Sequence, residues 1–443
     1  MVEQTTSSAA AESPAFLRAL TEMAQQRPIT TSRAIYNHQG IKLLEGGVQI
    51  DASLYDRLLV HRLAVPLDES VESDDAVTGA ALREAAEAAL ARWPFFALMA
   101  PAGRVRSMLL QSIEAIPLPQ PVALHLTLAR ETRPGMLEHG ILMALLCAHL
   151  VREGGAPIYD MTVAASAGLL HDLGMLHIDA ELLDPANTLS GDARRPLYAH
   201  PVTGSMLITR FHEYPLTVAR AVLEHHERLD GSGYPRALVG AAISPLGRLL
   251  SLCEVVTAMF DGERERPEQR VSLLLRVSPR RFDPALVPSI HRLLRALPPA
   301  ADALAAPVTA SIAASVASLR RLGELIGAWQ ATLAVSACAL DKAGQAVLGA
   351  VAEQAETLQR MLFEAGVAPA QLDLLGDADD ADPANASLGA ELWALSRELQ
   401  WHLRAGANQL RMRWRASRGA GGPPFPPDLA RWLDAVESLE APA

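Results

Sequence analysis

Hydrophobic positions recur every three to four residues along most of the chain, which is the period of amphipathic helices and predicts a mainly α protein. A proline-rich break at 116–121 precedes the central part of the chain. Because proline ends helices, we interpret this break as a linker into a central helical domain. Beyond it the pattern predicts helices over Met136–Arg152, Thr162–Leu170, Pro201–Phe211, Leu216–Arg228 and Leu246–Phe260.

The segment before the break predicts a smaller module of mixed structure. Residues 16–27 predict a short helix, and Gly40–Ile50 alternates apolar and polar residues around a Gly-Gly pair, which is typical of a hairpin. Asp51 and Ser53 offer capping side chains for a helix that continues through Leu63. We interpret this α+β module as a regulatory or packing element without catalytic residues.

The C-terminal part predicts a helical bundle or dimerisation element. Long apolar stripes of helical period cover 306–366 and 387–414, an acidic loop at 377–383 separates them, and a last helix is expected near 428–438. A basic cluster at 411–415 is interpreted as a solvated helix face. We therefore expect four segments: a disordered leader (1–15), the regulatory module (16–120), the central domain (121–300) and a helical C-terminal domain (301–443).

Composition narrows the class of protein. The net charge of -11 disfavours binding to nucleic acid, and it would repel an anionic ligand unless the site supplies positive charge. The cysteines are scattered singly, which argues against disulfides and fits a reducing cytoplasm. The longest apolar run, Gly140–Val151, is too short to span a bilayer, so no membrane span and a cytoplasmic location are expected.

Histidines and carboxylates cluster in the central domain as His171-Asp172, His200 and His225-His226. Imidazole nitrogen and carboxylate oxygen suit divalent first-row metals, and no thiolate is offered beside them. The Asp172 carboxylate has two oxygens, so it could bridge two ions about 3.5–4 Å apart. These residues predict a metal-binding pocket facing a phosphate-type substrate.

Three strings carry a family resemblance over roughly residues 130–295: HDLGMLHID at 171–179, HPVTG at 200–204 and HHERLDGSGYP at 225–235. In this order and separation they resemble the HD-GYP branch of the HD phosphohydrolase superfamily. The resemblance implies an all-helical metallohydrolase core that hydrolyses the bacterial second messenger cyclic di-GMP at a site of two or three metals. Carried over one by one, it implies the metal ligands His139, His171, Asp172, His200, His225 and His226.

Two departures from the family pattern bear on activity. The family usually has a lysine where this chain has Met175, and only Lys42 and Lys342 occur in the whole chain, so His177 or an arginine would have to stand in. The family's last ligand is an aspartate where this chain has Glu254, whose extra methylene shifts the ligating oxygen by about a bond length. Hydrolysis is favoured over the alternative, a degenerate domain that senses a cyclic dinucleotide or binds a protein without turnover.

The working hypothesis assigns two divalent transition metals, Fe or Mn, and makes Asp172 the shared catalytic ligand. One ion takes His139, His171, Asp172 and Glu254, and the other takes Asp172, His200, His225 and His226. A third metal is not expected, because Gly135 stands where a further carboxylate would be needed. The remaining partners are open: signalling proteins or a second copy through the C-terminal helices. The residues expected to contact the substrate are Asp230, Gly231, Gly233, Tyr234, Pro235, Arg266 and Arg270.

Overall fold

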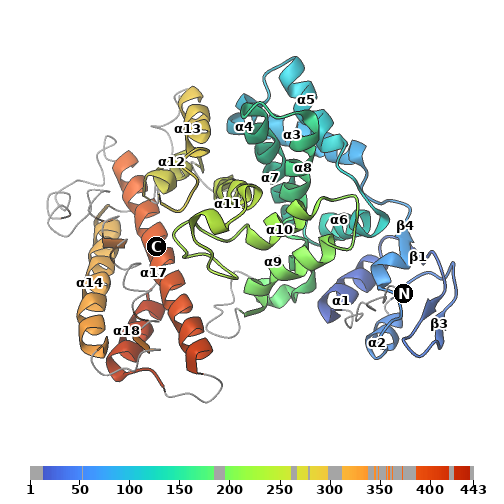
Figure 1. Ribbon diagram of the computed structural model, residues 1–443. Coiled ribbons are helices and arrows are strands. Elements are labelled where there is room, and N and C mark those ends of the chain that lie inside the picture. Colours follow the sequence, from blue (N-terminus) through green and yellow to red (C-terminus); the bar gives the residue numbers. More distant parts are fainter. Residues whose placement is uncertain are drawn as a thin grey trace, which may run out of the picture. The chain divides into compact units, whose positions relative to one another are not determined.

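The computed structural model divides into two compact units. The first comprises Met1–Arg264 with Pro288–Arg295, and the second comprises Glu265–Val287 with Ala296–Ala443. The structure describes residues 13–51, 53–183, 195–260, 267–277, 280–297, 312–337, 386–418 and 424–439, and single positions between 344 and 372. The mainly α fold class expected from the sequence is confirmed (Figure 1).

The first unit opens with helix α1 (Pro14–Met23), which Ser13 caps through its side chain. The helix therefore begins inside the segment expected to be a disordered leader, and residues 1–12 of that leader lie outside the described residues. Two small antiparallel sheets follow, β1 with β4 and β2 with β3. The elements of this module are β1 (Ile29–Thr31), β2 (Ile35–Tyr36), β3 (Lys42–Leu44), α2 (Leu54–Leu59), η1 (Leu67–Glu69) and β4 (Val71–Ser73).

The expected hairpin around Gly46-Gly47 is wrong in its pairing. Strand β3 pairs with the preceding strand β2, and the turn between them is set by Asn37, whose side chain accepts hydrogen bonds from the backbone N–H of Gln39 and Ile41. The segment after the Gly-Gly pair bridges to β1. The helix after Asp51 is also shorter than expected, because α2 ends at Leu59 and not at Leu63.

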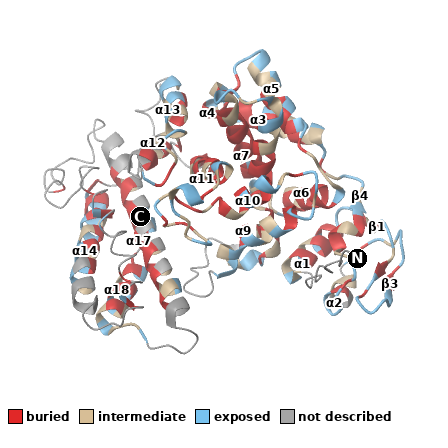
Figure 2. Cartoon of the chain, in the orientation of Figure 1, coloured by how far each residue is buried: buried red, intermediate tan, exposed pale blue. Residues whose placement is uncertain are grey.

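Helix α7 (Pro134–Glu153) lies at the centre of the first unit and is buried continuously from His139 to Leu150 (Figure 2). Its length and apolar composition would allow it to cross a membrane, but 67% of its apolar window is buried inside the protein. Around it pack α3 (Gly79–Arg92), α4 (Pro94–Met99), α5 (Arg104–Glu114), α6 (Gln120–Thr132), α8 (Ile158–Leu170) and α11 (Pro245–Thr257). The unit also contains η2 (Leu173–His177), η3 (Ala180–Leu183), α9 (Arg195–Ile208), α10 (Leu216–Glu224), η5 (Gly240–Ala242), η6 (Ala258–Phe260) and α13 (Val287–Ala296).

Three local expectations about these helices are corrected. The proline-rich break does not separate compact units, since Pro121 lies in the first turn of α6, and α3 and α5 pack on α7 and α8. Helix α9 begins at Arg195, so Pro201 lies inside the helix and not in its first turn. Helix α10 ends at Glu224, which leaves His225 as its C-cap residue.

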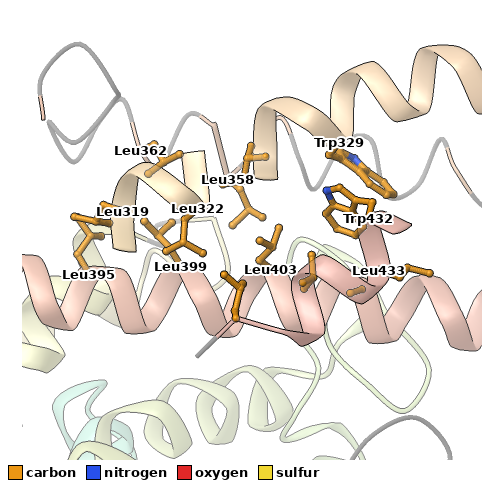
Figure 3. Close-up of a cluster of buried hydrophobic side chains, with 14 of the residues drawn as sticks. Leu319, Leu322, Trp329, Leu358, Leu362, Leu395, Leu399, Leu403, Trp432 and Leu433 are labelled. Carbon is orange, nitrogen blue, oxygen red and sulfur yellow. The ribbon is translucent and has the colours of Figure 1, made fainter. Parts of the chain in front are cut away.

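The second unit packs α14 (Ile312–Ala337), α17 (Ala386–Arg418) and α18 (Pro427–Glu437) around one apolar cluster, and α12 (Pro267–Val277) packs on α17. Leucines of α14 and α17 face one another in this cluster, and the Trp329 ring lies tilted against the Trp432 ring at 4.3 Å between centroids (Figure 3). Trp414 of the basic cluster is also buried here. The leucines of these apolar stripes that the structure describes are thus covered within the unit, and the dimer stays a prediction. The acidic loop at 377–383 lies outside the described residues.

Candidate metal centre

Seven side chains from five helical elements converge in the first unit to form two adjoining groups of ligand atoms. Asp172, His200, His225 and His226 form one group, and His139, His171 and Glu254 form the other. Within each group the ligand atoms lie within 4.8 Å of one another. These are the seven residues named from the sequence, and they divide as in the working hypothesis except that Asp172, which it shared between both ions, falls in one group.

Asp172 joins the two groups. One of its carboxylate oxygens, Oδ2, lies 3.4 Å from His171 Nε2, and the other, Oδ1, lies 3.2 Å from His200 Nε2. Glu254 plays the corresponding part in the second group, where Oε2 lies 3.0 Å from His139 Nε2 and 3.2 Å from His171 Nε2. The glutamate therefore reaches the position expected of it despite its additional methylene.

The histidine rings are oriented by backbone carbonyls one turn earlier in the chain. His171 and His225 are the C-cap residues of α8 and α10, where the last carbonyls of a helix lack helical donors. Their Nδ1–H groups donate to Gly168 O at 2.7 Å and to Val222 O at 2.6 Å. Each ring therefore turns its Nε2 toward the centre.

His200 obtains the same orientation by a different local device. Pro201 has no N–H to donate to the carbonyl of Leu197, four residues earlier in α9. The His200 ring supplies the missing donor, with Nδ1 2.5 Å from Leu197 O. The proline inside the helix thus helps to orient a metal ligand.

The rings so oriented fit a cation. With Nδ1–H used as a donor, Nε2 of a neutral histidine carries only a lone pair. His200 Nε2 and His225 Nε2 face each other at 3.2 Å, and the buried Nε2 of His171 lies 3.4 Å from Asp172 Oδ2 and 3.2 Å from Glu254 Oε2. Acceptors directed at acceptors repel one another unless a positive ion lies between them, and a divalent ion meets that need.

The electrostatics of the centre support the same conclusion. Burial disfavours charge on Asp172 and Glu254, but the neighbouring histidines outweigh burial and hold the pKa of both carboxyls well below its ordinary value. Burial also opposes charge on His171, yet the two carboxylates hold its pKa well above the ordinary value. Burial lowers the pKa of His225 to about 3. The centre therefore presents charged carboxylates beside the neutral imidazole of His225, and a metal would displace the proton of His171.

Close backbone contacts set the spacing between the ligand-bearing elements. A Cβ on Gly174 of η2 would lie 2.1 Å from His200 O. The absent side chain of Gly204, four residues after His200, lets α9 approach η2 and α10, as the sequence indicated. Arg133 adds a clamp from outside: its guanidinium donates to the carbonyls of Met175 and Ile178 at 2.6 and 2.8 Å.

The loop after His226 folds back over the centre. The Tyr234 ring stacks on the His226 ring at 4.6 Å between centroids. The backbone N–H of Tyr234 donates to His226 O. A Cβ at Gly233 would lie 2.4 Å from that same carbonyl, and Gly231 has a φ of 78°, so both glycines are required by the backbone. Pro235 follows Tyr234 through a cis peptide bond.

Glu227 holds this loop in place. It is fully buried, and its two carboxylate oxygens accept the backbone N–H groups of Arg236 and Leu238, each at 2.8 Å. Asp230 also acts within the loop, because its carboxylate accepts from the N–H and hydroxyl of Ser232. The substrate contact expected of Asp230 stays a prediction.

The substrate contacts expected of Arg266 and Arg270 stay predictions. Arg270 is in the second unit, where its guanidinium lies 5.7 Å from the Trp393 ring, and Arg266 lies outside the described residues. His177 does not replace the missing lysine at Met175, because its ring stacks on Phe16 of α1 at 4.9 Å. Sequence reasoning missed Arg133, Gly174 and the role of Glu227. Of these, Gly174 and Glu227 lie inside the quoted strings, whereas no local signal marks Arg133.

Comparison with known proteins agrees with this geometry. The HD domain family model matches residues 124–286. The 3'3'-cGAMP-specific phosphodiesterase 1 of Vibrio cholerae is 31% identical over 140 residues, 32% of each chain. A cyclic di-GMP phosphodiesterase of Pseudomonas aeruginosa is 31% identical over 121 residues, 27% of this chain and 29% of its own.

The cyclic di-GMP phosphodiesterase response regulator RpfG of Xanthomonas campestris is 32% identical over 139 residues, 30% of this chain and 36% of its own. This chain thus spans about a third of the length of the curated relatives it matches. The solved structure of Bd1817, a HDG"Y"P protein of Bdellovibrio bacteriovorus, aligns with a TM-score of 0.35 and 15% identity over 61% of this chain and 94% of that chain, a likeness too low to bear on the assignment. Residues 124–286 thus match the HD domain family, and this part of the chain is similar in sequence to the cyclic dinucleotide phosphodiesterases named above.

Proposed function

We propose that the protein hydrolyses a phosphodiester bond of cyclic di-GMP with divalent metal ions held at this centre. The observation that carries the proposal is the pair of ligand groups joined by Asp172, whose two oxygens face different histidines. The printed names of the matched relatives support the substrate class, since they describe phosphodiesterases of cyclic dinucleotides.

The chain's own residues divide the work. His139, His171 and Glu254 would hold one ion and His200, His225 and His226 the other, with Asp172 between them. Ions bound there supply positive charge that activates water and offsets the charge of the phosphoryl oxygens. The positive charge of the ions also offsets the protein's net charge of -11, which would otherwise repel an anionic dinucleotide.

We further propose two ions per chain, Fe or Mn. Seven ligands exceed the four of a single tetrahedral site, and a set of imidazoles and carboxylates without thiolate favours these metals. The free thiols of Cys147 and Cys253 are buried, and they fit the cytoplasmic location that we propose.

A non-catalytic sensor domain is the competing function. It is less favoured, because a ligating residue is present at all seven positions and the Nε2 atoms of His200 and His225 face each other. Met175 nevertheless leaves the pocket without the family's usual lysine. A cation added there would make a charge-assisted contact with a phosphate worth about 1.5–3 kcal/mol when partly desolvated.

The test is turnover of cyclic di-GMP by anaerobically prepared protein loaded with Fe or Mn. We expect slow hydrolysis by the wild type, faster hydrolysis by Met175→Lys and tighter metal binding by Glu254→Asp. The matched control is Met206→Lys, which adds the same charge at a position of α9 that is 66% exposed. If neither the metal-loaded wild type nor the double variant Met175→Lys/Glu254→Asp turns over substrate, the domain is a sensor.

A further inference from the structure

Tyr198 of α9 lies at the end of a row of aromatic rings that begins at the metal centre. The Tyr234 ring stacks on the ligand His226 at 4.6 Å with 26° between the ring planes. Tyr198 meets Tyr234 edge to face, at 4.7 Å and 74°. Because Tyr198 comes two residues before His200 in the same helix, the element that places a metal ligand also places this ring.

These two tyrosines differ from the structural aromatic residues of the same unit. Phe95, Phe96 and Phe260 pack on one another and are at most 2% exposed. Tyr214 is buried as well, and its hydroxyl donates to Pro117 O. Tyr198 and Tyr234 instead remain partly exposed, so aromatic surface next to the ligands stays accessible to a bound molecule.

The arginines around the loop are engaged with the protein itself. Arg220 and Arg236 both pair with the carboxylate of Glu224, and Arg228 donates to the carbonyls of His225 and Glu227 and to the Ser251 hydroxyl. Because these arginines are paired within the protein and Met175 stands in place of a lysine, we expect other groups to recognise a base. A nucleobase can stack on aromatic rings without any cation.

We propose that Tyr198 is a substrate-contacting residue that, with Tyr234, offers an aromatic wall to a nucleobase of the cyclic dinucleotide. This inference rests on the proposed hydrolysis of a cyclic dinucleotide at the adjoining centre. The metals would hold the phosphodiester, and the wall would hold a base beside it. Tyr198 then contributes to substrate specificity and leaves metal binding to the seven ligands.

The experiment compares two phosphodiesters on full-length, Mn-loaded protein: cyclic di-GMP, which has bases, and bis(p-nitrophenyl) phosphate, which has no nucleobase. The readout is the ratio of kcat/KM for cyclic di-GMP to kcat/KM for bis(p-nitrophenyl) phosphate, with metal content measured on each sample. Stacking of a base on an aromatic ring predicts that Tyr198→Ala lowers this ratio roughly 5- to 50-fold, mainly through KM for cyclic di-GMP. Tyr198→Phe keeps the ring and is expected to stay within about threefold of the wild type.

Two further variants separate contact from packing. Tyr198→Leu fills most of the volume beside Tyr234 but has no aromatic face, so it should behave like Tyr198→Ala. Tyr159→Ala removes a tyrosine that is 65% exposed at the far end of α8 and serves as the matched control with a wild-type ratio.

The possible outcomes distinguish failure of the proposed Tyr198 contact from failure of the proposed hydrolysis. A wild-type ratio in Tyr198→Leu, or an unchanged ratio in Tyr198→Ala, overturns the contact, as does loss of metal from either variant. In all three cases hydrolysis by the wild type would leave the proposed function standing. A metal-loaded wild type that hydrolyses neither diester overturns the proposed function itself, and the role of Tyr198 with it.

Discussion

Gly174→Ala is expected to damage the metal centre although it replaces none of the seven ligands. The added Cβ would lie 2.1 Å from His200 O and 2.8 Å from Gly204 N, whereas ordinary contacts begin near 3.4 Å. Both neighbours are backbone atoms, so α9 and η2 would have to separate by about 1 Å. Overpacking of this kind costs typically about 1–3 kcal/mol, which corresponds to a fall in Tm of about 2–4 °C for each kcal/mol in a domain of this size.

The same displacement separates two ligands of one group. Asp172 precedes η2 and His200 lies on α9, and the atoms Oδ1 and Nε2 are 3.2 Å apart. Because metal sites tolerate about ±0.2 Å in their ligand distances, a movement several times larger should weaken binding at this group. Thermal unfolding with and without added Mn, together with metal analysis, measures both effects.

Gly135→Ala is the matched control. It makes the same change near the start of α7, where nothing lies within 4 Å of the added Cβ, so stability should be unchanged or slightly higher. If Gly174→Ala matches this control in Tm and in bound metal, the argument that the η2–α9 contact sets the ligand spacing is refuted.

Two other predictions concern groups around the centre. Glu227→Gln replaces one of two accepting oxygens with an N–H donor that faces a backbone N–H. The change should lower the free energy of unfolding by about 1.5–3 kcal/mol and speed amide hydrogen exchange at Arg236 and Leu238. Unchanged exchange would contradict the role of Glu227 in the loop. Burial, with His125 nearby, lowers the pKa of His177 to about 3, so the unfolded chain binds a proton below about pH 6.5 that the folded protein does not. The stability from His177 is therefore complete above that pH and lost as pH falls, by about 2 kcal/mol at pH 5. Urea unfolding at pH 7 and pH 5 should show a smaller loss for His177→Leu than for the wild type, and equal losses would refute the assignment.

The sequence predicted what depends on local pattern. Helical periodicity located α7, α8, α10 and α11 to within a few residues, and the motif strings contain five of the seven ligands. The other two, His139 and Glu254, were named from the family resemblance. Each ligand lies on or at the end of a helix whose boundaries are set by nearby residues. The orientation of His171 follows from its place at the end of α8, where free carbonyls are available.

The remaining features depend on contacts distant in sequence. Strand β3 could pair with either neighbour by its own pattern, and the turn at Asn37 decided between them. Pro201 is compatible with a first helical turn, but here the helix already begins at Arg195. Gly174 is required because the carbonyl of His200 lies close to it. Arg270 lies against the ring of Trp393. Neither partner is adjacent in the chain.

The most direct test of the central claim is the metal content of protein prepared anaerobically with Fe or Mn, measured for the wild type and for Asp172→Ala. The carboxylate of Asp172 lies between the two ligand groups, so its removal should lower occupancy in both. We expect about two ions per chain in the wild type, because the seven ligands form two groups, and a clear loss at both positions in the variant. A wild type without bound metal, or a variant that keeps the full complement, would contradict the account of this centre.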